Sequence, residues 1–278
     1  MITLPDILQA QQRIRSHIFR TPLRYSFLLS ERVGASVFLK LENWQITGSF
    51  KLRGALNRMA LLTQEECARG IVTASAGNHA NGVGYAARAM NISPTTIFVP
   101  QTAPRSKLAK LRQYPVDVRL VGETYDDAHH AAEKFERETG ATFIHGYDDP
   151  RTVAGQGTIG LEIIEDLPDV DAVLIPVGGG GMFAGIATAI KTVAPSTQIF
   201  GIQPVASPSL RDSLRDGKCY EAYVAGPTIC EGLAGGVGRL CFEAAQREAY
   251  LDGAPLVDES ETRAAVRALA ETEQLIVE

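Results

Sequence analysis

The chain has 278 residues, of which 45% are hydrophobic and 21% charged, and these are ordinary values for a globular protein with a sizeable core. Its length predicts two domains or one large α/β unit. The formal net charge of −5 offers no basic surface for nucleic acid and no polybasic patch for a membrane. Cys67, Cys219, Cys230 and Cys241 lie far apart without a C-x-x-C pair, so we expect mostly buried thiols in a reducing, cytoplasmic compartment.

The start of the chain does not read as a secretory signal. Residues 1–18 predict a helix with one apolar face that charges interrupt throughout. The uncharged stretch 172–190 approaches the ~20 residues that a membrane helix needs. Pro176 and the glycines at 178–181 break it, which predicts a buried strand, a tight turn and a buried helix in a soluble protein.

Strand-like and helix-like runs alternate along most of the chain. The predicted strands, short and rich in β-branched or aromatic residues, are 36–40, 71–74, 95–99, 116–121, 142–145, 172–177 and 197–202. The predicted helices between them include 81–90, 107–113, 125–138 and 182–193. This alternation predicts α/β layers around parallel sheet. Residues 71–144 form a self-contained run of strand–helix units, which we interpret as a smaller domain inserted in a larger one.

Four consecutive glycines at 178–181 follow a predicted buried strand and open a predicted helix. Their backbone amides and the positive end of the helix dipole suit a phosphate group, although a tight turn that only permits close packing is the alternative. Gly179, Gly181 and Ala184 also satisfy the dinucleotide pattern G-x-G-x-x-A. That pattern requires an acidic residue after the next strand, where this chain has Gln203, so a dinucleotide is disfavoured.

Residues 47–55 read T-G-S-F-K-L-R-G-A and place Lys51 at a helix start. A solvated surface lysine is the ordinary interpretation of such a residue. Its amine forms a Schiff base only when it is partly neutral, and burial favours the neutral form. Phe50, Leu52 and Ala55 beside it are compatible with burial, but their spacing does not establish it.

Residues 73–82 read T-A-S-A-G-N-H-A-N-G, a strand end followed by a helix start. Ser75, Asn78 and the turn amides suit a carboxylate, because a helix N-terminus attracts anions. A helix cap without a ligand is the alternative. His79 suits an acid–base role by its chemistry, but a histidine at a helix start is commonly structural.

Together and in this order, G-S-F-K-x-R-G-A, S-x-G-N-H and G-G-G-G resemble the serine/threonine dehydratase family of fold-type II pyridoxal-phosphate enzymes. R-T-P-L at 20–23 and L-K-L-E-N at 39–43 also match, so the resemblance runs from near the start of the chain to its last residue. It implies a tryptophan synthase β-like fold of two three-layer α/β domains with the cofactor in the cleft between them. Residues 1–62 and 148–278 would form the large domain, and residues 63–147 the small, mobile one.

The resemblance also implies a role for each matched residue. Lys51 would hold pyridoxal 5'-phosphate as a Schiff base and take the Cα proton of the substrate. The implied cofactor-binding residues are Phe50, Lys51, Asn78, Gly178, Gly179, Gly180, Gly181, Met182 and Gly232. The loop implied to bind the substrate carboxylate consists of Ser75, Ala76, Gly77, Asn78 and His79.

The implied reaction removes water and then ammonia from a small hydroxy-amino acid such as L-threonine or L-serine, leaving the 2-oxo acid. Serine racemases of the family place a serine where this chain has Ala76, and alanine exchanges no proton, so dehydration is favoured over racemisation. A racemase of the same fold, a catalytically silent ligand-binding protein and, more remotely, a nicotinamide oxidoreductase are the alternatives. Threonine, serine and bulkier 3-hydroxy acids all stay open as substrates. The family resemblance also implies a homodimer.

Two departures from the family pattern carry further expectations. Family members that bind a divalent cation use Glu and Asp after the strand that ends near 202, where this chain has Gln203, Ser207 and Ser209, so we expect no metal site. The sequence stops at Glu278, where relatives continue through a Gly/Ser-rich turn and a helix that carry the residue facing the pyridine nitrogen. If the chain ends there, we expect weaker cofactor binding and activity, and no isoleucine-type feedback.

Overall fold

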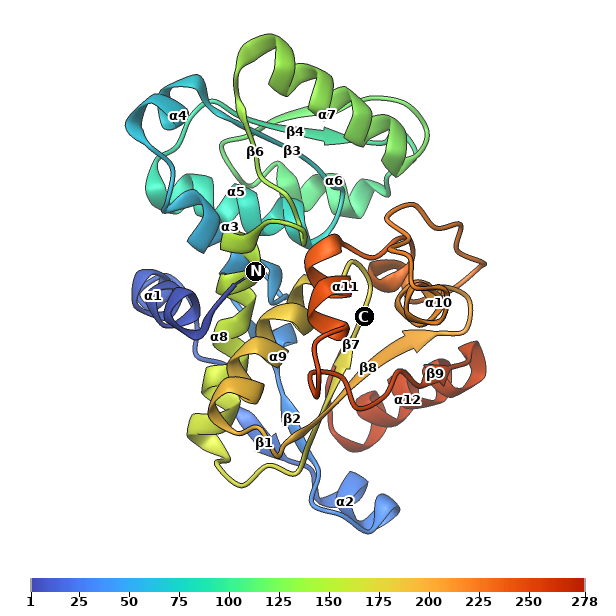
Figure 1. Ribbon diagram of the computed structural model, residues 1–278. Coiled ribbons are helices and arrows are strands. Elements are labelled where there is room, and N and C mark those ends of the chain that lie inside the picture. Colours follow the sequence, from blue (N-terminus) through green and yellow to red (C-terminus); the bar gives the residue numbers. More distant parts are fainter. Residues whose placement is uncertain (1, 278) are drawn as a thin grey trace.

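The computed structural model describes residues 2–277 and contains two parallel sheets (Figure 1). The strands are β1 (Leu23–Tyr25), β2 (Phe38–Lys40), β3 (Ile71–Ala74), β4 (Thr95–Val99), β5 (Asp117–Leu120), β6 (Thr142–Phe143), β7 (Ala172–Pro176), β8 (Gln198–Pro204) and β9 (Leu256–Val257). The α-helices are α1 (Leu4–Ile14), α2 (Phe27–Val33), α3 (Lys51–Met59), α4 (Gln64–Arg69), α5 (Asn78–Met90), α6 (Arg105–Leu111), α7 (Tyr125–Thr139), α8 (Pro150–Asp166), α9 (Gly181–Val193), α10 (Ser209–Asp216), α11 (Arg239–Ala245) and α12 (Glu259–Thr272). Two 3₁₀ turns, η1 (Glu42–Trp44) and η2 (Glu231–Leu233), complete the described elements.

The first parallel sheet has the order β5-β4-β3-β6, all from one continuous segment of the chain. Its central strands β3 and β4 are buried along their whole length, because helices cover both faces. Phe98 packs toward Ala128 and Ala132 of α7, whereas the alternate residues Ile97 and Val99 pack with α5 and α6 on the other face. Figure 1 shows α7 above this sheet and α5 and α6 below it.

The second sheet has the order β7-β8-β9 and lies in the lower part of Figure 1 with α8 and α9 beside it. Helix α8 packs against α1, α3 and α9, and it is buried from Thr152 to Ile163. At its contact with α9, a Cβ on Gly185 would lie 2.5 Å from the backbone of Gly157, so glycine is needed for the close approach. Since α8 is surrounded on all sides, it lacks the polar face that marks a surface helix, and its existence is not predicted from the sequence.

The predicted elements agree with the structure best where a strand is fully buried. Strands 71–74 and 95–99 are confirmed residue for residue, whereas the strand predicted at 142–145 ends at Phe143 and the one at 197–202 continues to Pro204. The helix predicted at 81–90 begins three residues earlier, at Asn78. The helix predicted at 1–18 spans only α1, and residue 1 lies outside the described residues.

All four cysteines are free thiols, but the expectation that they are mostly buried is wrong. Cys241 is buried, whereas Cys67, Cys219 and Cys230 are only partly buried. Cys67 and Cys219 pack against the outside of the apolar core rather than within it. Among residues 2–277, no helix is long and apolar enough to span a membrane.

Candidate active site

Lys51 is the first residue of α3 and is partly buried, with its amine hydrogen-bonded to the protein backbone. Nζ donates a hydrogen bond of 2.8 Å to the carbonyl oxygen of Gly146. It lies 5.2 Å from the ring centre of Phe50 and 5.8 Å from that of Tyr147. Burial lowers the pKa of Lys51 from 10.5 to about 8, because the ammonium loses hydration there. The amine is therefore far more often neutral at physiological pH than a surface lysine.

The four glycines at 178–181 form the turn between β7 and α9, where the sequence predicts it. Gly180 has a φ of +79°, and a Cβ there would overlap Sγ of Cys241. A Cβ on Gly179 would overlap the ring of Tyr147. Close packing therefore accounts for part of the glycine run. In the part of the chain that the structure describes, no side chain caps α9, so its first N–H groups point to the site without a side-chain partner.

Residues 75–77 connect β3 to α5, which Asn78 and His79 begin, and the hydroxyl of Ser75 accepts a hydrogen bond from the Gly77 amide at 3.1 Å. The imidazole of His79 is buried, and its Nε2–H donates to the carbonyl of Ile144 at 2.8 Å. Burial and, next, the charge of Lys51 lower the pKa of His79 to about 3. His79 is thus neutral at physiological pH and joins α5 to the end of β6, which favours its structural interpretation.

The turn after β6 brings these separate segments together. Gly146 accepts from Lys51 Nζ, and a Cβ on Gly146 would lie 3.3 Å from the ring of His79. The next residue, Tyr147, covers Gly179 with its ring, and its carbonyl would lie 2.5 Å from a Cβ on Gly181. Neither Gly146 nor Tyr147 is predicted from the sequence as a site residue. Their position at the carboxyl end of a predicted strand, next to a parallel sheet edge, is the signal that points to them.

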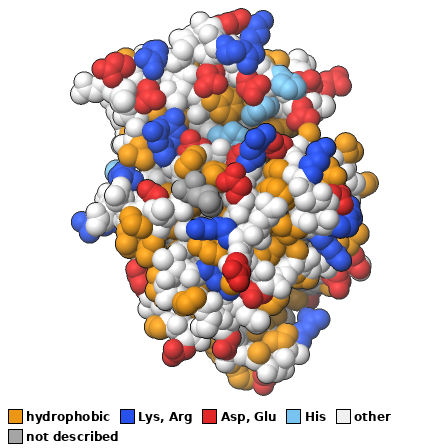
Figure 2. All heavy atoms as spheres, viewed as in Figure 1, with side chains coloured by type: hydrophobic (Ala, Val, Ile, Leu, Met, Phe, Trp, Pro, Cys, Tyr) orange, Lys and Arg blue, Asp and Glu red, His pale blue; other side chains and the backbone are white. Residues whose placement is uncertain are grey.

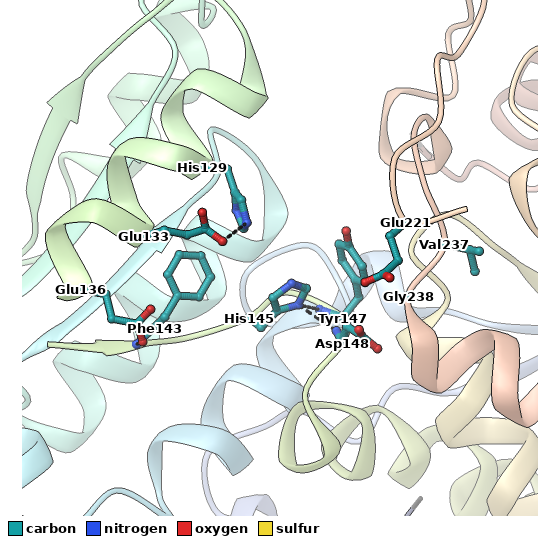
Figure 3. Close-up of a pocket in the computed structure, with 10 residues that line it drawn as sticks. All are labelled: His129, Glu133, Glu136, Phe143, His145, Tyr147, Asp148, Glu221, Val237 and Gly238. Atoms are coloured by element: carbon teal, nitrogen blue, oxygen red, sulfur yellow. Dashed lines mark hydrogen bonds and ion pairs between the residues drawn. The ribbon is translucent and has the colours of Figure 1, made fainter. Parts of the chain in front are cut away.

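A pocket of about 400 Å³ opens beside Tyr147, between α7 and the start of α11 (Figure 3). It is lined by His129, Glu133, Glu136, Phe143, His145, Tyr147, Asp148, Glu221, Val237 and Gly238. Figure 2 shows histidine side chains gathered on this face of the molecule with acidic side chains around them. Tyr147 therefore lines this pocket and also lies near the Lys51 amine.

Behind Lys51, a buried group of charges anchors α3. The guanidinium of Arg53 donates to both oxygens of Glu162 at 2.7 and 2.8 Å and to both oxygens of Glu42 at 2.9 and 2.8 Å. Lys40 Nζ also donates to Glu162, at 2.6 Å, and the Thr21 hydroxyl donates to Glu42 at 2.5 Å. The matched segments 20–23 and 39–43 therefore meet around Arg53. Glu162, on the unpredicted helix α8, is not identified from the sequence.

Gln203, Ser207 and Ser209 are all fully buried, and their hydrogen bonds are those of a structural cluster. The Gln203 amide nitrogen donates to the carbonyl of Val177, directly before the glycine turn, at 3.2 Å. Its oxygen accepts from the amides of Leu210 and Arg211 at the start of α10. Across residues 2–277, no three His, Cys, Asp or Glu side chains are grouped as a metal site would require.

The pyridoxal-phosphate dependent enzyme family matches residues 14–278 of this chain. The chain belongs to that family. It is 46% identical to an L-threonine ammonia-lyase of Thermotoga maritima, over all of this chain and 69% of the relative. It is 38% identical to a catabolic L-threonine dehydratase of Escherichia coli K12, over all of this chain and 83% of the relative.

Solved structures of a threonine deaminase and a serine racemase superimpose closely on this pyridoxal-phosphate enzyme. A threonine deaminase isoform from Solanum lycopersicum superimposes with a TM-score of 0.94 at 38% identity, covering 99% of this chain and 74% of that one. A serine racemase of maize superimposes with a TM-score of 0.93 at 31% identity, covering all of this chain and 83% of that one. The fold-type II architecture expected from the sequence is confirmed.

The residues present fit the family cofactor. Pyridoxal phosphate needs an amine for its aldehyde and donors for its phosphate. Lys51 supplies a partly buried amine of lowered pKa, and in the described chain α9 supplies a helix start without a side-chain cap, behind closely packed glycines. Tyr147 touches both, since its ring lies against Gly179 and near Lys51 Nζ.

Proposed function

We propose that this enzyme removes water and then ammonia from L-threonine or L-serine and releases the 2-oxo acid. The observation that carries the proposal is the Lys51 amine, which is partly neutral, lies near the rings of Phe50 and Tyr147 and donates to the Gly146 carbonyl. Relatives that match the whole chain at 38 and 46% identity are a threonine dehydratase and a threonine ammonia-lyase, which favours this substrate class.

In this proposal Lys51 would hold the cofactor aldehyde, and residues 178–181 with Met182 would hold its phosphate at the start of α9. Phe50 would pack beside the cofactor ring, Asn78 would donate to the ring hydroxyl, and Gly232 would line the far side. The closeness of Gly232 to the glycine turn supports that role, since its carbonyl would lie 2.7 Å from a Cβ on Gly178. When bound, the cofactor withdraws electron density from the substrate Cα–H bond.

The protein side chains and amides would then orient and move the substrate atoms. Residues 75–79 would bind the substrate carboxylate at the start of α5, where partial positive charge and backbone N–H groups favour an anion. Lys51 Nζ, freed when the substrate amine takes its place on the cofactor aldehyde, would take the Cα proton, and the β-hydroxyl would leave with one proton as water. The enamine product would take up one water after release and yield the 2-oxo acid and ammonia.

We further propose that residues 63–147 form a small domain that closes on the large domain of residues 1–62 and 148–278. Closure would exclude water from the reacting centre. The sheet β5-β4-β3-β6 lies wholly within residues 63–147, which supports this division. An ion pair between Lys107 on α6 and Glu231 on η2, at 2.6 Å, joins the two proposed domains. Because both side chains are exposed, this contact is weak enough to break when substrate enters.

We also propose a homodimer in the cytoplasm. Phe19, Trp44 and Ile46 are each about half exposed, and they lie together because Gln45 is hydrogen-bonded to both the amide and the carbonyl of Phe19. Such a group of large apolar side chains favours burial against a second copy. Sedimentation of the wild type and of Trp44→Arg tests this, and a wild-type monomer would contradict it.

The activity test uses the purified protein saturated with pyridoxal phosphate. Incubation with L-threonine or L-serine should release 2-oxobutyrate or pyruvate with an equal amount of ammonia, and Lys51→Ala should abolish this turnover. Borohydride treatment of the wild type should fix the cofactor to the peptide that contains Lys51. Attachment to any other lysine would contradict the proposed role of Lys51.

A further inference from the structure

His145, between β6 and α8, accepts two backbone hydrogen bonds at one ring nitrogen (Figure 3). Its Nδ1 lies 3.3 Å from the amide nitrogen of Tyr147 and 2.8 Å from that of Asp148. A nitrogen that accepts cannot carry a proton, so the neutral ring holds its proton on Nε2. The imidazole therefore shapes the turn in the way that an Asx side chain shapes its own turn.

The same turn presents the carbonyl that holds the Lys51 amine. Gly146 lies between His145 and the two amides, and its oxygen accepts from Lys51 Nζ at 2.8 Å. Beyond it, Asp148 Oδ1 accepts from the Leu240 amide of α11 at 2.9 Å. The turn is thus fixed at both ends, and its middle residue faces the reacting amine.

We propose that His145 is a positioning residue for Lys51: its Nδ1 holds the Tyr147 and Asp148 amides and so aims the Gly146 carbonyl at the lysine amine. This inference depends on the catalytic role proposed above for Lys51. His145 itself acts only through the turn. A glycine at position 146 has no side chain to define its conformation, so the hydrogen bonds on either side of it decide where its carbonyl points.

Protonation of His145 at Nδ1 would remove the acceptor and release the turn. The groups that face it are Asp148 in the turn, His129 on α7, Lys51 on α3 and Asp149 at the start of α8. Burial lowers the pKa of His145, the two carboxylates oppose this, and the charges of His129 and Lys51 add to it. The net effect is a lowered pKa, so the acceptor is present at neutral pH and is lost only in acid.

The test compares His145→Asn with His145→Ala in the cofactor-loaded enzyme. The asparagine Oδ1 can accept from the same two amides but cannot titrate, whereas alanine removes the acceptor. In His145→Ala we expect hydrogen–deuterium exchange at the Tyr147 and Asp148 amides to become faster by about tenfold or more, because each amide loses its hydrogen bond to the His145 ring. We expect kcat to fall by a similar factor with a smaller change in KM. His130→Ala, at an exposed neighbouring histidine on α7, is the control and should match the wild type.

His145→Asn should keep wild-type amide exchange and kcat at neutral pH, and its activity should persist to lower pH than that of the wild type. The proposal is overturned if His145→Ala has the amide exchange rates and the kcat of the wild type. It is equally overturned if amide exchange in His145→Ala becomes faster while its kcat does not change. It is also overturned if the asparagine variant behaves like the alanine variant. If the wild type turns over no hydroxy-amino acid, the proposed function fails instead. The pH dependence of Lys51 acylation in the same variants then still tests the coupling between His145 and Lys51.

Discussion

Arg53 and Glu162 form a two-point ion pair between α3 and α8 with both side chains buried, only two residues along the chain from Lys51. Burial alone would lower the pKa of Arg53, but hydrogen bonds to Glu162 and the charge of Glu42 outweigh it and raise the pKa. The guanidinium of Arg53 therefore stays charged at any pH at which the protein is folded. Because α3 begins at Lys51, the contact fixes the helix that carries the reactive amine.

Removing Glu162 should destabilise the protein strongly, because Arg53 and Lys40 would both lose a buried carboxylate. We expect Glu162→Ala to lower the free energy of unfolding by roughly 3–5 kcal/mol. Glu165→Ala on the same helix is the matched control, since it removes an exposed ion pair with Arg20, which precedes β1, and should cost about 1 kcal/mol or less. Denaturant unfolding of both variants measures the difference, and equal costs would show that burial of the pair is not what matters.

Cofactor capture by the apoprotein should follow the protonation of Lys51. Only the neutral amine attacks an aldehyde, and burial lowers the pKa of Lys51 to about 8. The capture rate should therefore rise about tenfold per pH unit below that value and level off above it. The growth of visible absorbance after mixing apoprotein with pyridoxal phosphate gives the rate, and Lys51→Ala should show none. A rate that keeps rising to the ordinary lysine pKa of 10.5 would contradict a buried amine.

Chelation should leave both the rate and the thermal stability unchanged, because Gln203, Ser207 and Ser209 supply no carboxylate for a hard cation. Gln203→Glu should instead destabilise the protein by about 1–3 kcal/mol, since a carboxylate cannot donate to the Val177 carbonyl and would be buried there. Thermal unfolding and activity of the wild type are measured with and without chelator, and thermal unfolding of Gln203→Glu gives its loss of stability. A loss of activity that magnesium restores would show that a cation site exists.

Ala76 decides between dehydration and racemisation in the proposed reaction. Racemisation needs a proton donor on the face of Cα opposite Lys51, and a methyl group cannot supply one. L-serine should therefore yield pyruvate with little D-serine, and Ala76→Ser should raise the D-serine fraction measurably. Chiral chromatography of the amino acid that remains gives the ratio. D-serine formation by the wild type at a rate that rivals pyruvate would make the enzyme a racemase.

The sequence alone determined the elements and motifs whose signal is local. The strands 71–74 and 95–99 are confirmed. Both faces of each strand are buried, so β-branched and other apolar residues occur along its whole length rather than at every second position. The glycine run predicts the turn that it forms between strand and helix. The motifs around Lys51, Asn78 and Gly178 also sufficed to place the chain in its family. The residue roles read from those motifs, and the division into domains, stay predictions.

Only the tertiary structure decided what surrounds those motifs. Helix α8 has no amphipathic period because other helices enclose it, so its position and that of Glu162 follow from packing rather than from pattern. Gly146 and Tyr147 reach Lys51 from nearly a hundred residues away along the chain, and nothing in the local sequence records that contact. The lowered pKa of Lys51 has the same origin, because desolvation depends on every segment that closes over the amine.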